Sequence, residues 1–214
     1  MNFLKALFGG NSENSEEKKK EEEAKNFDVL KFDGVRALRG NEMDYAIKCF
    51  THALELKEDL EVRDYLSQAY THNNELLPAF EQLQKLAEAQ PDNQEIFIRM
   101  ANVAFMMEDY GAMADSCEKA ELINKENPLV SYLYARACLG QDDMVNAIAM
   151  LTKAIALKED YGDAYLLRGE TLLKMGDVNG AEEDVAYLME HVKDNEDVLL
   201  LKARVEAKKG NADE

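Results

Sequence analysis

The chain has 214 residues, of which 46% are hydrophobic, and its formal net charge at pH 7 is −18. This apolar content is enough for a hydrophobic core, whereas so large a negative charge repels phosphate backbones and argues against a nucleic-acid partner. Only three prolines and eleven glycines are present, which fits an all-α chain, because both residue types are unfavourable inside helices.

The chain begins with a short apolar head, residues 1–10, in which Phe3, Leu4, Leu7 and Phe8 recur at helical spacing. The head lacks the length and the cleavage pattern of a secretory signal. No stretch of the chain reaches the ~18 apolar residues that a transmembrane helix needs. We therefore expect a cytoplasmic protein in which the head alone is suited to membrane contact.

Residues 11–26 are charged and of low complexity, and they show no apolar periodicity. A segment of this composition cannot bury enough apolar surface to order itself. We expect a flexible or frayed-helical linker between the head and the rest of the chain.

A period of about 34 residues organises the chain from Phe27 onward. Pivotal, mostly small residues are separated by 33, 34, 34 and 34 positions: Ala46, Ala79, Met113, Ala147 and Ala181. Such a fixed period is typical of a helix–turn–helix array, in which each unit is too small to bury its own apolar face. The units predicted from this period are residues 27–59, 60–93, 94–127, 128–161 and 162–195.

Each unit contains a turn between two helical halves. These turns are expected at residues 39–42, 72–75, 107–110, 141–144 and 175–178. Gly and Asn accept the left-handed backbone at the end of the first helix, and Asp or Asn can cap the second. Residues 197–209 form one further helical pattern without a partner, which we expect to cap the last unit.

The units resemble the tetratricopeptide repeat, whose pattern of aromatic, small and apolar residues spans 34 positions. The fifth unit carries the resemblance through Tyr165, Gly169, Leu172, Ala181 and Val185. The fourth unit carries it through Tyr134, Ala135, Cys138, Ala147, Leu151 and Ala154. The resemblance covers residues 27–195 and implies an all-α fold. The implied architecture is a right-handed α-solenoid of about five units plus the capping helix, over residues 27–210.

Small residues have a physical role in this pattern. The two helices of a unit are expected to cross at Gly34, Ser67, Ala101, Ala135 and Gly169. Large side chains at these positions would push the helix axes apart and overpack the contact.

No catalytic or metal-binding motif is recognisable. The three histidines belong to separate units and have no ligand companions: His52, His72 and His191. The three cysteines lack a zinc or disulfide spacing, which favours buried hydrophobic roles and a reducing compartment: Cys49, Cys117 and Cys138. We expect no enzyme, no cofactor and no metal.

The resemblance implies that the first helices of successive units line a concave groove for peptides or partner helices. The residues expected to face it are Asp64, Gln68, Ile98, Arg99, Asn102, Phe105, Met106, Tyr132, Leu133, Arg136, Leu166, Glu170 and Arg204. Large apolar side chains on such a wall suggest a binding surface. For Leu133, ordinary packing within the stack is the alternative. Arg99, Asn102 and Arg136 are suited to holding a carboxylate.

The function that these features favour is a non-catalytic scaffold that binds a peptide or a partner helix in this groove. The partner would be a protein or peptide, either basic, to match the net charge, or bearing a free carboxylate. Solubility is the favoured explanation of the negative charge, and attraction of a basic partner is the functional alternative. An alternative is a membrane-proximal assembly factor tethered by its amphipathic head. Self-association is a third possibility to which no residue points specifically.

Overall fold

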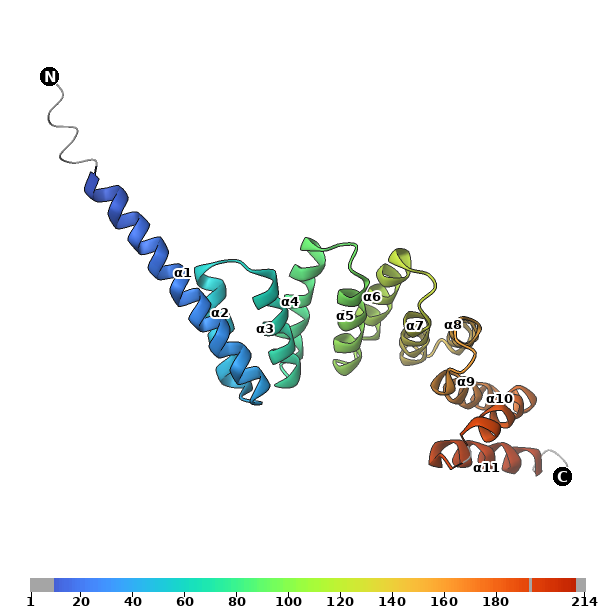
Figure 1. Ribbon diagram of the computed structural model, residues 1–214. Coiled ribbons are helices and arrows are strands. Elements are labelled where there is room, and N and C mark those ends of the chain that lie inside the picture. Colours follow the sequence, from blue (N-terminus) through green and yellow to red (C-terminus); the bar gives the residue numbers. More distant parts are fainter. Residues whose placement is uncertain (1–9, 193, 211–214) are drawn as a thin grey trace, which may run out of the picture. The chain divides into compact units, whose positions relative to one another are not determined.

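The computed structural model describes residues 10–192 and 194–210, and in this part of the chain it contains eleven α-helices packed in sequential pairs (Figure 1). The all-α architecture of paired helices is therefore confirmed. None of these helices combines the length and the apolar content needed to cross a bilayer. The apolar head lies outside the described residues except for Gly10, so its membrane contact stays a prediction.

The chain divides into two compact units, with the boundary between Ala89 and Gln90. Unit 1 contains α1 (Gly10–Arg39), α2 (Met43–Leu56), α3 (Leu60–His72) and α4 (Leu76–Ala89). Unit 2 contains α5 (Gln94–Met106), α6 (Tyr110–Ile123), α7 (Pro128–Gly140), α8 (Met144–Leu157), α9 (Gly162–Met175), α10 (Val178–His191) and α11 (Glu196–Gly210). A single continuous solenoid over residues 27–210 stays a prediction.

The first helix includes residues 11–26, for which a flexible or frayed-helical linker was expected. The structure continues α1 as one helix of 30 residues from Gly10 to Arg39. Glu and Lys are good helix formers, and the i,i+4 pair of Lys19 and Glu23 has its charged atoms 3.8 Å apart. The far end of α1 is anchored on α2 through the buried ring of Phe27. The helix therefore extends outward from a packed end, although residues 17–26 are exposed.

The turn inside each pair has the same backbone in all five cases. One residue of each turn has a positive φ: Asn41, Asn74, Glu108, Asp142 and Gly176. The residue that follows donates its N–H to the carbonyl five positions earlier, at 2.9 Å every time. This is the Schellman ending of a helix, which requires the left-handed conformation. In three pairs an aspartate then caps the second helix: Asp109, Asp143 and Asp177.

The contact between paired helices is closely packed around small residues. Ala46, Ala79, Ala147 and Ala181, one on the second helix of each of four pairs, have no exposed surface. A Cβ added at Gly34 would lie 2.5 Å from the Phe50 ring. The predicted role of these small residues at the helix crossing is consistent with this geometry.

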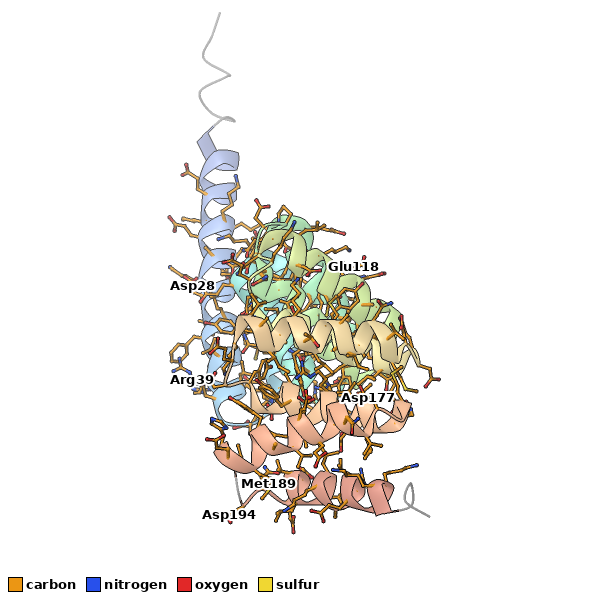
Figure 2. The ribbon with its side chains drawn as sticks, turned by 90° about the vertical axis from the view of Figure 1, so that its right-hand side faces the viewer. Asp28, Arg39, Glu118, Asp177, Met189 and Asp194 are labelled. Atoms are coloured by element: carbon orange, nitrogen blue, oxygen red, sulfur yellow. The ribbon has the colours of Figure 1, made fainter. Side chains whose placement is uncertain are left out.

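Carboxylates lie on the outside of the helices. Asp28 on α1, Glu118 on α6 and Asp177 before α10 are all exposed, and Figure 2 shows their positions on the side-chain view. The net negative charge is therefore carried at the solvent boundary, where it costs little desolvation.

Gly176→Ala should destabilise the protein by about 1–2 kcal/mol, because φ is +88° there and an L side chain is strained in that region. No atom lies within 4 Å of the added Cβ, so the cost is one of backbone alone. Gly111→Ala, at an exposed position on α6, is the matched control. It should leave stability unchanged or raise it, because Ala favours a helix more than Gly does. Urea unfolding measures both. Equal effects of the two substitutions would contradict the assigned turn geometry.

Gly169→Leu should cost about 1–3 kcal/mol through overpacking. A Cβ at this position would already lie 2.9 Å from Leu201 and 3.3 Å from the Cβ of Asp184. Thermal unfolding followed by circular dichroism provides the measurement. An unchanged midpoint would show that α9 is not held this closely against its neighbours.

Candidate functional site

The structure places the expected groove residues of unit 2 in three groups, which are exposed, half-buried and buried. Asn102, Met106 and Arg204 are exposed, whereas Ile98 and Leu133 retain only 5% and 2% of their surface. Ile98 and Leu133 are thus packing residues of the stack in this structure, which for Leu133 is the alternative given above, and the groove itself stays a prediction. The two first helices α5 and α7 contact each other directly, and this packing covers one side of each helix.

Other predicted members also have structural partners. Gln68 donates a hydrogen bond to the Asp64 carboxylate at 2.8 Å within α3 of unit 1. Arg99 already takes part in an interaction, so it is not a free cation waiting for a carboxylate. Leu166 packs against the buried cluster of the last pair and is only partly exposed. The proposed carboxylate grip of Arg99, Asn102 and Arg136 stays a prediction.

A row of aromatic rings and one guanidinium crosses the first helices of unit 2. The Arg136 guanidinium lies 3.7 Å from the centre of the Phe105 ring and 5.9 Å from that of Tyr132. The Tyr132 ring lies 5.2 Å from the ring of Tyr161, which precedes α9. We call Phe105, Arg136, Tyr132 and Tyr161 the aromatic–arginine row. It links α5, α7 and the start of α9 through direct contacts.

The row is partly withdrawn from water. All four side chains are half-buried. Burial raises the pKa of Tyr161 to about 12, with Tyr132 and Asp163 acting in the same direction. Burial also raises the pKa of Tyr132, although the nearby Arg136 charge opposes this shift. Binding requires that water be removed from the surface. For a surface that is already poorly solvated and rich in aromatic carbon, the free-energy cost of this desolvation is small.

Helix α9 is held in place by an ion pair to α10. The Arg168 guanidinium donates two hydrogen bonds to the buried Asp184 carboxylate, at 2.6 and 3.0 Å. This bidentate geometry fixes one side of α9. Glu170 and Leu173 of the same helix line a pocket that faces α11.

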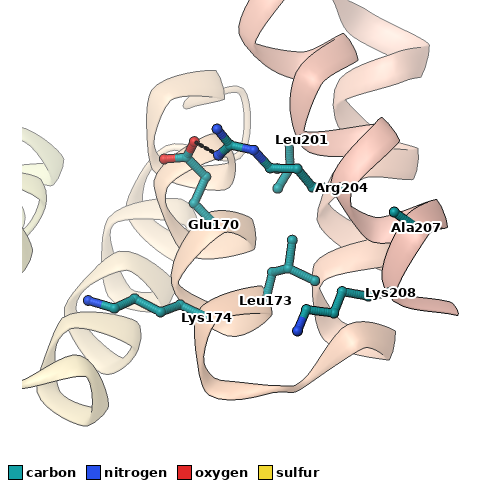
Figure 3. A pocket seen from close by; sticks show the side chains of 7 residues that line it. All are labelled: Glu170, Leu173, Lys174, Leu201, Arg204, Ala207 and Lys208. Atoms are coloured by element: carbon teal, nitrogen blue, oxygen red, sulfur yellow. Dashed lines mark ion pairs between the residues drawn. The ribbon is translucent and has the colours of Figure 1, made fainter. Parts of the chain in front are cut away.

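A pocket of about 600 Å³ lies between α9 and α11, and we call it the α9–α11 pocket. Figure 3 shows its apolar side chains between the helices and its charged groups around them. The residues that line it are Glu170, Leu173, Lys174, Leu201, Arg204, Ala207 and Lys208. Arg204 and Glu170 approach each other to 3.7 Å across the pocket. Its volume lies in the range of ~300–1,000 Å³ that is usual for ligand sites.

Sequence reasoning found Glu170 and Arg204 of this pocket but missed the other charged members. The missed cations lie one helical turn further on, because Lys174 follows Glu170 by four residues and Lys208 follows Arg204 by four. Residues at i,i+4 share a helix face. Applying this spacing to α9 and α11 would have identified both lysines.

The cysteines and histidines do not contribute a second site in the described residues. Cys49, Cys117 and Cys138 are buried free thiols, as predicted, and burial raises the pKa of the Cys117 thiol to about 12. Within residues 10–192 and 194–210 no group of three or more His, Cys, Asp or Glu side chains is arranged to hold a metal ion.

Comparison with known proteins identifies the same architecture. A tetratricopeptide repeat family model matches residues 139–205. The crystal structure of a MamA protein is 18% identical, with a TM-score of 0.72 over 78% of this chain and 92% of that one. MamA from Desulfovibrio magneticus RS-1 is 17% identical, with a TM-score of 0.72 over 80% and 97%.

A third similar structure is TTC0263, a thermophilic TPR protein in Thermus thermophilus. It is 18% identical, with a TM-score of 0.56 over 87% of this chain and 98% of that one. No curated protein matches the sequence significantly. At these identities the likeness to solved structures concerns the fold.

A double-mutant cycle should show that Phe105 and Arg136 are coupled. Removing both by Phe105→Ala and Arg136→Ala should cost less than the sum of the single substitutions, by about 0.5–2 kcal/mol, because each loses the same cation–π contact. Urea unfolding provides the free energies. Phe105→Ala with Arg204→Ala is the control pair and should be additive. Additivity in both pairs would contradict the stacked geometry.

Proposed function

We propose that this chain, which matches a tetratricopeptide repeat family model over residues 139–205, is a non-catalytic scaffold that binds a peptide or helix of a partner protein. The binding surface would be the solvent-facing side of the first helices α5, α7 and α9 in unit 2. We call this surface the first-helix face. It comprises the aromatic–arginine row together with the exposed side chains of Asn102 and Met106 on α5.

The observation that carries the proposal is the aromatic–arginine row. Its four side chains come from α5, α7 and the residue before α9, and each lies against the next, which gives a preformed surface rather than scattered exposed residues. Tyr and Arg are enriched among the residues that dominate binding energy, because both combine a large apolar area with hydrogen-bonding groups. Their mutual contacts reduce the entropy lost on binding.

The edges of the row remain available for hydrogen bonds. A guanidinium stacked on an aromatic ring still presents its N–H donors in the plane of the group. Arg136 can therefore contact the carbonyls or carboxylates of a bound peptide while its faces stay against Phe105. Met106 is 47% exposed beside this row and offers an adaptable apolar contact.

The proposal is tested with peptides selected from a random phage-displayed library on the full-length protein. Phe105→Ala with Tyr132→Ala should weaken their binding at least about 10-fold, as expected for the loss of central aromatic residues. Fluorescence anisotropy with labelled peptide gives the dissociation constants. The melting curve of the variant shows whether its fold is intact.

Two further variants make the outcome decisive. Asn102→Arg with Met106→Arg adds bulk at exposed positions on α5 without removing a packed side chain, and it should also block binding. Leu122→Ala with Val145→Ala truncates the 80% and 67% exposed residues of α6 and α8 and should leave affinity unchanged. If peptide affinity falls only for the variant with Leu122→Ala and Val145→Ala, the peptides do not bind on the first helices and the proposal is wrong.

A further inference from the structure

The α9–α11 pocket reverses the charge that dominates the chain. The protein has 43 acidic and 25 basic residues, yet the pocket is lined by three cationic side chains and one carboxylate. Glu170, the single carboxylate, is already 3.7 Å from Arg204. Among the described residues, no carboxylate pairs with Lys174 or Lys208. The rim of the pocket thus carries excess positive charge on an otherwise acidic molecule.

The floor of the same pocket is apolar. Leu201 is buried to 1% exposure, and Leu173 packs beside it against the core of the last helix pair. Ala207 leaves space above this floor because its side chain is a single methyl group. Figure 3 shows Leu173 and Leu201 between the two helices, with Arg204 extended toward Glu170. An apolar floor with a cationic rim fits a ligand that is apolar at its centre and anionic around it.

We infer that the α9–α11 pocket binds an acidic peptide segment of the partner, with a large apolar side chain on Leu173 and Leu201 and flanking carboxylates beside Lys174, Arg204 and Lys208. This inference rests on the proposed function, since it specifies the chemistry of the peptide. The carboxylates are those of Asp or Glu side chains, so a free chain terminus is not required.

A peptide is favoured over a small ligand because the pocket lies next to the proposed binding face. Glu170, Leu173 and Lys174 line the pocket from α9, and Tyr161 of the aromatic–arginine row directly precedes the same helix. One extended chain can therefore occupy both. In that arrangement Lys174, Arg204 and Lys208 bind acidic residues at one end of the peptide. The rest of the peptide lies along the aromatic–arginine row and crosses α7.

The net negative charge makes this local positive region selective. An acidic peptide is repelled by most of the surface and attracted only where cations gather, which orients it during encounter. Basic peptides, which the net charge alone would favour, are repelled at this pocket. The pocket therefore predicts the opposite sign of partner from the one that the overall charge suggests.

The test uses the full-length protein and a short synthetic peptide with a central Leu-Phe pair flanked by Asp and Glu, acetylated and amidated at its ends. Two matched peptides carry Lys in place of the acids, or Ala-Ala in place of Leu-Phe. Fluorescence anisotropy at several NaCl concentrations gives the affinities. We expect only the parent peptide to bind, and more weakly as salt rises, because salt screens the ion pairs.

Two variants of the pocket and one control locate the binding. Lys174→Glu with Lys208→Glu should lower affinity about 10-fold, because two attractions become repulsions. Ala207→Trp fills the pocket from an exposed position and should also abolish binding. Lys119→Glu with Lys125→Glu makes the same charge change at exposed lysines on and after α6, and affinity should stay within twofold.

Three results would overturn the inference. The first is equal affinity for the acidic and the lysine peptide, and the second is equal affinity of the pocket variants and the wild type. The third is that the protein binds mixed phosphatidylcholine and phosphatidylserine vesicles but not the peptide, and that the pocket variants lose this vesicle binding. That result would assign the pocket to an anionic lipid. If the acidic peptide does not bind at the pocket but library-selected peptides still bind at Phe105 and Tyr132, the inference about the pocket is wrong and the proposed function is retained.

Discussion

The close approach of the two helices in each pair is the constraint on which the rest of the structure depends. Ala46, Ala147 and Ala181 have no exposed surface, and a Cβ added at Gly169 would lie 3.3 Å from the Cβ of Asp184 on the paired helix α10. Small side chains at these positions let paired helices approach closely, and the large Phe50 ring fits between α1 and α2 where it meets Gly34. The large side chains of the first helices in unit 2 include buried ones, such as Leu133, and the half-buried aromatic–arginine row. The close helix packing therefore sets the frame that carries the candidate surface.

The repeated turn determines how each pair is connected. A left-handed residue and the hydrogen bond that follows it end the first helix at the same place in every pair, and an aspartate begins the second helix in three of them. The geometry is the same although Asn, Glu, Asp and Gly occupy the left-handed position. The surrounding pair therefore imposes the turn, even where Glu108 adopts it at an energetic cost.

The period of 34 residues was sufficient to predict the helix pairs, because it reflects backbone packing that every unit shares. The period could not predict which large apolar residues of the first helices would be buried and which would stay half-exposed. Phe105 lies half-exposed against Arg136 whereas Leu133 is buried, and both were expected in the groove. That difference depends on contacts between neighbouring pairs, which a repeat pattern does not specify. Residues 11–26, for which a flexible or frayed-helical linker was expected, belong to one continuous helix, because helix propensity and an anchored end outweigh the absence of apolar periodicity.

Methyl NMR of the labelled full-length protein tests most directly whether the first helices of unit 2 form a peptide-binding surface. On titration with the acidic Leu-Phe peptide, the account predicts shifts for Met106, Leu166 and Leu173, next to the aromatic–arginine row and in the α9–α11 pocket. The exposed methyl groups of Leu122 and Val145 on the second helices should not move. Shifts confined to Leu122 and Val145, or none at saturating peptide, would contradict it.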